Sequence, residues 1–201
     1  MNALAPRGFS PRLLPAILAT LAVVAVGTAT PSYAAIFNYI ATLNGLNEAP
    51  SNGSPGVGSA LVQIDDVANT MAISATFSGL IGTVTASHIH AATAIALTGT
   101  VGVATTTPTF PGFPSGVTAG VYVNTLDLTL ATSYNPSYVT ANGGTTATAR
   151  TALLLAMAAG KSYFNIHSTT FGGGEIRGFL VPNPATPTHS ATWGRIKSSY
   201  R

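Results

Sequence analysis

The sequence of 201 residues contains no cysteine. This absence excludes disulfide bonds, zinc–thiolate sites, iron–sulfur clusters and cysteine nucleophiles. The folded chain must therefore be held by its apolar core and its backbone hydrogen bonds, or by a metal bound through other side chains.

Charged residues are scarce as well: they make up 6% of the chain, whereas an average soluble domain carries about 25%. Hydrophobic residues make up 46%, so Thr, Ser, Asn and Gly must solubilise the surface, as is common on extracellular β-proteins. The formal charge of +3 comes from the two ends of the chain. Between residues 35 and 182, three cations stand against five carboxylates: Arg150, Lys161 and Arg177 against Glu48, Asp65, Asp66, Asp127 and Glu175. This body, near −2, shows no basic face for nucleic acid.

The first 35 residues predict a secretory signal peptide. Arg7 and Arg12 make a positive start, residues 13–26 form an apolar run, and Ser32-Tyr33-Ala34 offers a cleavage site before Ala35. The alternative, an uncleaved membrane anchor, needs roughly 20 apolar residues, and no later stretch reaches that length either. We therefore expect a secreted or periplasmic protein with no membrane contact after cleavage.

The end of the chain, residues 182–201, is rich in proline and ends with three scattered cations. Closely spaced prolines exclude a central strand, so the segment predicts a flexible tail. His189 lies in this tail and is expected to be solvated.

Residues 36–181 predict one all-β domain. Short β-type runs separated by Gly, Pro and Asn turns indicate an antiparallel sandwich or barrel. The expected strands are 37–43, 58–64, 71–77, 84–90, 95–103, one or two within 117–130, 161–167 and 175–181. Residues 105–116 and 134–144 are expected to be loops. One short helix is expected at 148–159, closed by Gly160.

The body contains only three histidines, His88, His90 and His167. In a strand, His88 and His90 would point to the same face, close enough to grip one ion, and His167 from another strand would complete a three-nitrogen site. Imidazole suits copper, zinc, nickel and iron. The alternative is a structural cluster in which the histidines only form hydrogen bonds, and the sequence leaves both interpretations open.

A second concentrated signal is the Gly-rich segment 172–178, which contains Glu175 and Arg177. These charges could pair with each other, or with Asp127 or Glu48. We interpret them as a structural ion pair, with a catalytic carboxylate as the alternative. The sequence shows no Gly-x-Ser-x-Gly elbow, phosphate loop or dinucleotide fingerprint.

Four motifs in fixed order resemble the CHRD (chordin-type) domain family, in the form of a bacterial exported member. The resemblance covers roughly residues 36–181. Its motifs are residues 37–50 with the turn Asn47-Glu48-Ala49-Pro50, Gly79-Leu80 before His88-Ile89-His90, the segment with Tyr163, Asn165 and His167, and Glu175-Ile176-Arg177-Gly178.

This resemblance implies a β-sandwich with Greek-key, superoxide-dismutase-like architecture, of the kind found in an extracellular binding protein, and an extracellular protein as partner. The leading hypothesis is a non-catalytic binding module with a copper site at His88, His90 and His167, where Glu175, Arg177 and Asn165 hold the neighbouring strands. A structural or adhesive module without metal is the second hypothesis. A dismutase-like redox enzyme is the third, although that family uses a further bridging histidine that this body lacks.

Overall fold

The structure, a computed structural model, describes Met1 and residues 36–183. The predicted leader, His189 and nearly all of the predicted tail lie outside these residues. Among the described residues, no helix is long and apolar enough to cross a membrane.

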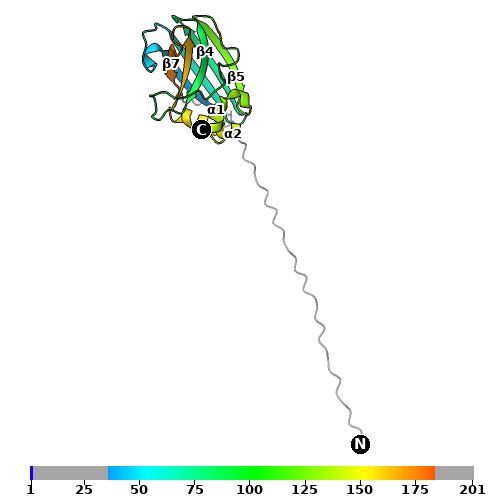
Figure 1. The fold of residues 1–201 in the computed structure, drawn as a ribbon. Coiled ribbons are helices and arrows are strands. Elements are labelled where there is room, and N and C mark those ends of the chain that lie inside the picture. Colours follow the sequence, from blue (N-terminus) through cyan, green and yellow to red (C-terminus); the bar gives the residue numbers. More distant parts are fainter. Residues whose placement is uncertain (2–35, 184–201) are drawn as a thin grey trace, which may run out of the picture. The chain divides into compact units, whose positions relative to one another are not determined.

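Eight antiparallel strands form one sheet, shown in Figure 1. Seven strands follow the order β4-β6-β7-β1-β2-β3-β5, and β8 pairs with β1 beside this path. Their bounds are β1 Ile36–Asn44, β2 Val57–Asp65, β3 Thr70–Ser78, β4 Val84–Ala91, β5 Gly120–Asp127, β6 Ser162–Ser168, β7 Ile176–Phe179 and β8 Val181–Pro182.

The sheet curls into a half-barrel because its two edges approach each other. The N–H of Val84, at the start of β4, donates to the carbonyl of Val117 at 2.8 Å, and the N–H of Gly116 donates to the carbonyl of Val84 at 2.9 Å. The all-β, antiparallel class is thereby confirmed. Two separate facing sheets and Greek-key connections are not confirmed, since the described strands form one continuous sheet.

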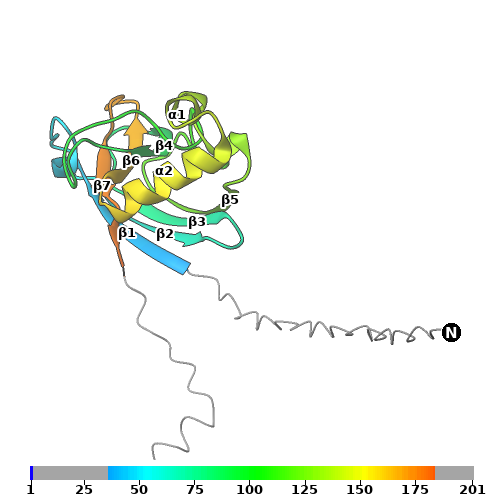
Figure 2. The same ribbon diagram turned by 90° about the horizontal axis from the view of Figure 1, so that it is seen from below.

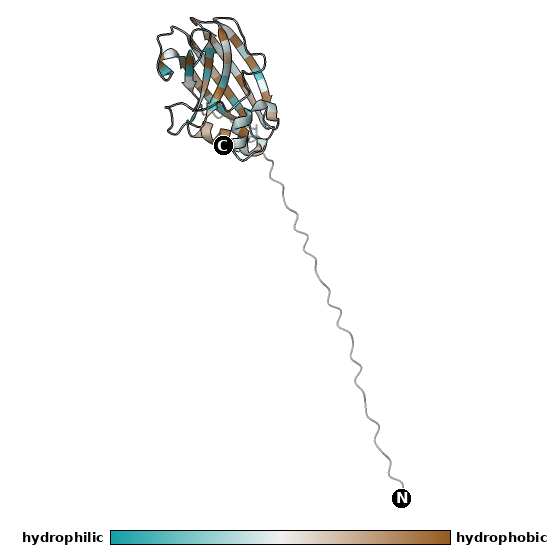
Figure 3. Ribbon diagram, viewed as in Figure 1, coloured by the Kyte–Doolittle hydropathy of each residue, from teal (hydrophilic) through white to brown (hydrophobic). Residues whose placement is uncertain are grey.

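Strand alternation places one apolar core inside the half-barrel. In β3, Met71, Ile73 and Phe77 are buried, while Ser74 and Thr76 face outward, and Figure 3 shows the same banding along other strands. Helix α2 (Thr146–Ala158) lies across one end of the half-barrel (Figure 2) and buries Leu153 and Met157 completely. Its end matches the prediction, because Gly160 takes a positive φ of 65°.

Two predictions about local structure are wrong. Residues 95–103 form a loop rather than a strand: Leu97 adopts a φ of 59° and is tethered to the carbonyl of Gly160, which breaks the extended path. The expected loop 134–144 contains a helix, α1 (Pro136–Ala141), because Asn135 caps it and Pro136 occupies its first turn.

Short 3-10 turns occur at Gly45–Asn47 and Ala131–Ser133. The range 117–130 yields a single strand, β5.

Gly178→Ala should destabilise the half-barrel by about 1–3 kcal/mol, because a methyl group at this position would collide with the backbone carbonyl of Thr42 on β1. Urea unfolding of both proteins measures the difference. Gly53→Ala is the matched control, since its added carbon meets no atom within 4 Å, and it should change the stability by less than about 0.5 kcal/mol. An equal effect of both substitutions would contradict the close β1–β7 approach.

Candidate metal centre

The three histidines of the described residues lie on neighbouring strands, β4 and β6. In their register, His90 faces Tyr163 and His88 faces Asn165. Ile89, between the two β4 histidines, is fully buried in the apolar core, so His88 and His90 point to the opposite face of the sheet. The histidines therefore gather on the outer face of the half-barrel, apart from the core.

The imidazole rings form one compact cluster. Ring centroids are 4.8 Å apart for His88 and His90, 4.7 Å for His88 and His167, and 6.1 Å for His90 and His167. One nitrogen from each ring lies within 4.8 Å of the other two. Only 6% of His88 and 8% of His90 are exposed, and His167 is partly buried. The structure thus brings together all three residues that the sequence singled out.

Backbone carbonyls fix which nitrogen of two rings carries the proton. His90 Nδ1 lies 2.7 Å from the carbonyl of Val101, and His167 Nδ1 lies 2.9 Å from the carbonyl of Gly172. A carbonyl only accepts, so each Nδ1 donates and each neutral ring keeps its lone pair on Nε2. Both Nε2 atoms, and Nδ1 of His88, are buried without a hydrogen-bond partner among the described residues.

The surroundings keep these rings neutral. Burial, together with repulsion by His167 and His90, lowers the pKa of His88 to about 3. Burial also lowers the pKa of His90 to about 4, against the raising effect of the Val101 carbonyl. The pKa of His167 is lowered by the same cause. Neutral imidazoles with free lone pairs are the form that binds transition metals.

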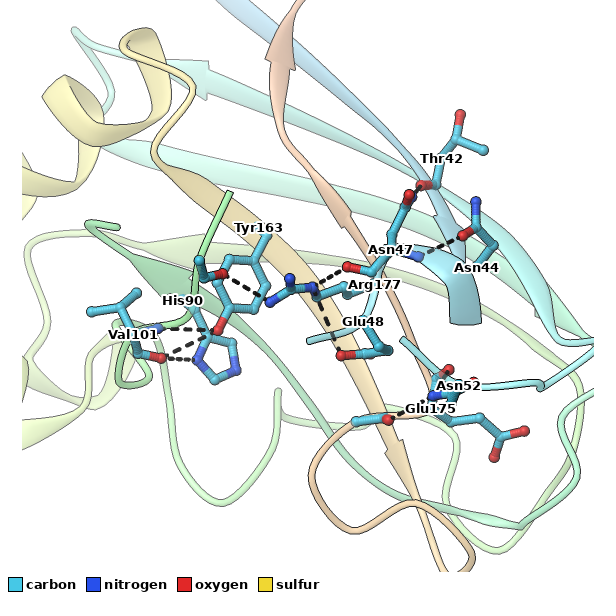
Figure 4. A network of polar contacts seen from close by, with 12 residues as sticks. Thr42, Asn44, Asn47, Glu48, Asn52, His90, Val101, Tyr163, Glu175 and Arg177 are labelled. Carbon is cyan, nitrogen blue, oxygen red and sulfur yellow. Dashed lines mark hydrogen bonds and ion pairs between the residues drawn. The ribbon is translucent and has the colours of Figure 1, made fainter. Parts of the chain in front are cut away.

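The buried guanidinium of Arg177 anchors the loops beside the cluster, as Figure 4 shows. It donates to the carbonyls of Asn47 and Gly99, and its Nε lies 3.8 Å from the carboxylate of Glu48. It also lies over the ring of Tyr163, 4.7 Å from the centroid. Burial raises the pKa of Glu48 to about 7, although the charge of Arg177 and the N–H of Ala49 lower it.

Glu175 does not pair with Arg177, so of the partners considered from the sequence Glu48 is the correct one. The carboxylate of Glu175 accepts hydrogen bonds from the N–H groups of Ile81 and Gly82 and from the hydroxyl of Ser54. Burial raises the pKa of Glu175, but hydrogen bonds that include one from Ser168 outweigh it and hold the pKa below its usual value. This fully buried group thus links the loop at Ser54 and the turn at Ile81 and Gly82 to the start of β7.

Asn165 lies between the cluster and the ion pair. It is opposite His88 on one side and Arg177 on the other, and only 2% of it is exposed. Its amide packs against Gly174 next to Oε1 of Glu48, where a side chain on Gly174 would collide with both. The role predicted for Asn165, holding the neighbouring strands, fits this position.

The donor set fits a transition-metal ion. When two imidazole nitrogens each bind the same ion at 2.0–2.1 Å, they are at most about 4.2 Å apart. The ligand nitrogens here are up to 4.8 Å apart, so ion binding would have to bring them closer by roughly 0.6 Å. The fixed tautomers of His90 and His167 add the backbone support that metal-ligating histidines usually have.

The sequence did not single out Tyr163 or the carbonyls of Val101 and Gly172 as parts of the site. The Tyr163 ring stacks on His90 at 4.5 Å with an angle of 8° between the planes. Its place two residues before Asn165 in the same strand was the available signal. Backbone carbonyls carry no side-chain identity, so no sequence signal could have found them.

Comparison with known proteins agrees with the resemblance seen in the motifs. The family model described as the CHRD domain matches residues 39–180. No curated protein and no solved structure matches the chain significantly.

The metal-free protein should lose stability as the pH falls from about 6.5 toward 4. In this window the unfolded chain protonates His88 and His90, whereas the folded chain holds them neutral, so acid favours unfolding. Glu48 acts in the opposite sense, because its raised pKa makes the folded state bind the extra proton between about 4.5 and 7.

Urea unfolding of wild type and His88→Asn across this range isolates the contribution of one histidine. The variant should lose on the order of 2 kcal/mol less than wild type between the two pH limits. Parallel pH profiles would show that His88 is protonated as easily in the folded chain as in the unfolded one.

Proposed function

The chain belongs to the CHRD domain family, and from this premise we propose that it is an exported, non-catalytic binding module that holds one copper ion through His88, His90 and His167. One observation carries the metal assignment. Three imidazoles on two strands each have a buried nitrogen without a hydrogen-bond partner among the described residues, and the three rings offer ligand nitrogens within 4.8 Å of one another. Burying such groups without partners costs free energy, and a bound ion would remove that cost.

Copper is the proposed ion because all three ligands are imidazoles. Imidazole suits copper, and copper(II) stands highest in the order of affinities of the divalent first-row metals. Within residues 36–183 no cysteine, Asp or Glu joins the histidine group. When bound, copper would supply Lewis acidity and one-electron redox chemistry. The protein's part is to present neutral rings in fixed tautomers and to exclude water from His88 and His90.

A structural module is the second candidate function. The rings also contact one another, and Val101 and Gly172 tie two loops to them. In that case the cluster would only fasten loops to the sheet. A dismutase-like redox enzyme, with the sandwich architecture that it implies, is less well supported, because the described residues contain no fourth histidine to bridge a second metal.

Export is proposed on the signal-peptide pattern before Ala35 and on the low content of charged residues. The mature protein would then meet metal and partners outside the cytoplasm. We propose an extracellular protein, rather than nucleic acid, as the macromolecular partner, since the body lacks a basic face.

Copper titration of the protein starting at Ala35 tests the metal site. Wild type should bind one equivalent of copper. His88→Ala, His90→Ala and His167→Ala should each lower the copper affinity by at least about 100-fold, because the site then keeps two imidazoles instead of three. At a free copper concentration of 100 Kd, binding should raise the free energy of unfolding by about 2.7 kcal/mol.

His189→Ala is the matched control, because it removes an imidazole that the sequence predicts to be solvated. It should leave stoichiometry and affinity unchanged. If wild type bound no metal while the three cluster variants were only less stable, the histidines would be structural and the metal proposal would fail.

A further inference from the structure

The charges around the histidine cluster are arranged asymmetrically. The ring of His90 stacks on the ring of Tyr163 at 4.5 Å, and the Cζ atom of Arg177 lies 4.7 Å from the centroid of that same tyrosine ring. A full positive charge therefore lies one aromatic ring away from a proposed ligand. Only 4% of Arg177 is exposed, so solvent screens this charge weakly.

The charge of Arg177 has one carboxylate partner among the described residues. Glu48 meets Arg177 at Nε, 3.8 Å away, and its other oxygen has no partner among the described residues. The carboxylate of Glu48 therefore balances the guanidinium only in part, and the remaining charge of Arg177 opposes added positive charge at His90.

The ligands themselves bring no negative charge. The group that can hold an ion consists of three neutral imidazoles, and within residues 36–183 no carboxylate belongs to it. A divalent ion would keep its whole charge of +2 in a poorly solvated place beside a guanidinium. Three nitrogens are also one ligand fewer than the four that zinc takes in closed sites.

We propose that the histidine cluster selects copper(I) over divalent ions, because its ligands are neutral and the buried charge of Arg177 disfavours a second positive charge on the ion. This inference rests on the proposed metal-binding function and specifies the ion that the site takes. Glu48 limits the selection by partly balancing Arg177.

The size of the effect follows from Coulomb's law. The two stacking distances of 4.7 and 4.5 Å place the guanidinium roughly 10 Å from an ion on His90. At an effective dielectric constant of about 20, one unit of charge at that distance changes the relative affinity for monovalent and divalent ions by roughly tenfold.

The test measures the affinities of the protein for copper(I), copper(II) and zinc(II). Copper(I) affinity is measured without oxygen, by competition with a chromogenic copper(I) chelator, and the divalent affinities by competition with a metal indicator. Wild type should bind copper(I) more tightly than either divalent ion. At pH 8, where the carboxylate of Glu48 is charged because its pKa is about 7, Glu48→Gln keeps the side-chain shape but removes the charge opposite Arg177. This substitution should widen the copper(I)-to-zinc(II) affinity ratio by up to roughly tenfold.

Asp127→Asn is the matched control, because it removes the same charge from an exposed carboxylate at the end of β5 and should leave the ratio unchanged. Zinc(II) or copper(II) binding as tight as copper(I) binding would overturn the selection and leave the metal site standing. Binding of none of the three ions would overturn both proposals. The wild-type affinities decide the selection whether or not Glu48→Gln folds, and an equal loss for all ions in that variant would assign Glu48 a structural role only.

Discussion

Burial of the guanidinium of Arg177 is the constraint on which the outer face of the half-barrel depends. Its cost is offset by hydrogen bonds to Asn47 and Gly99, by the ion pair with Glu48 and by the ring of Tyr163. Asn47 and Glu48 lie on one loop, Gly99 on another and Tyr163 on β6, so this one side chain of β7 fastens two loops and a neighbouring strand together. Removing one member of such a group leaves an uncompensated buried charge, which typically costs 3–5 kcal/mol. The histidines stay shielded from water because these loops stay in place.

The two faces of the sheet differ in their chemistry. Its concave side holds aliphatic and aromatic residues, whereas the outer face of β4, β6 and β7 holds the three histidines, Asn165 and Arg177 under loops. Glu175 is satisfied by backbone and hydroxyl donors and ties the loop at Gly82 to the end of the sheet. Glu48, Glu175 and Arg177 are thus the buried charged residues of the described part, and each has polar partners there. Neutral imidazoles with free nitrogens are left at the centre of the outer face.

Periodicity made most of the fold predictable, because strands such as β3 alternate strictly and the spacing of His88 and His90 requires a common face. The meeting of His167 with them follows from β4–β6 pairing, which no local pattern in the sequence predicts. Residues 95–103 misled the prediction because a β-type composition is overridden by the contact of Leu97 with Gly160. Asn135-Pro136 signals either a turn or a helix start, and local sequence does not decide between them. The pairing of Arg177 with Glu48 joins distant positions and becomes visible only in the folded chain.

The central claim is that three imidazoles bind one metal ion on the outer face of the sheet. X-ray absorption spectroscopy of the copper-loaded protein tests it most directly, because it reports the number, type and distance of the ligand atoms. The account predicts about three imidazole nitrogens near 2.0 Å, with the multiple-scattering signal of histidine rings. A spectrum dominated by oxygen ligands, or by a single imidazole, would contradict it.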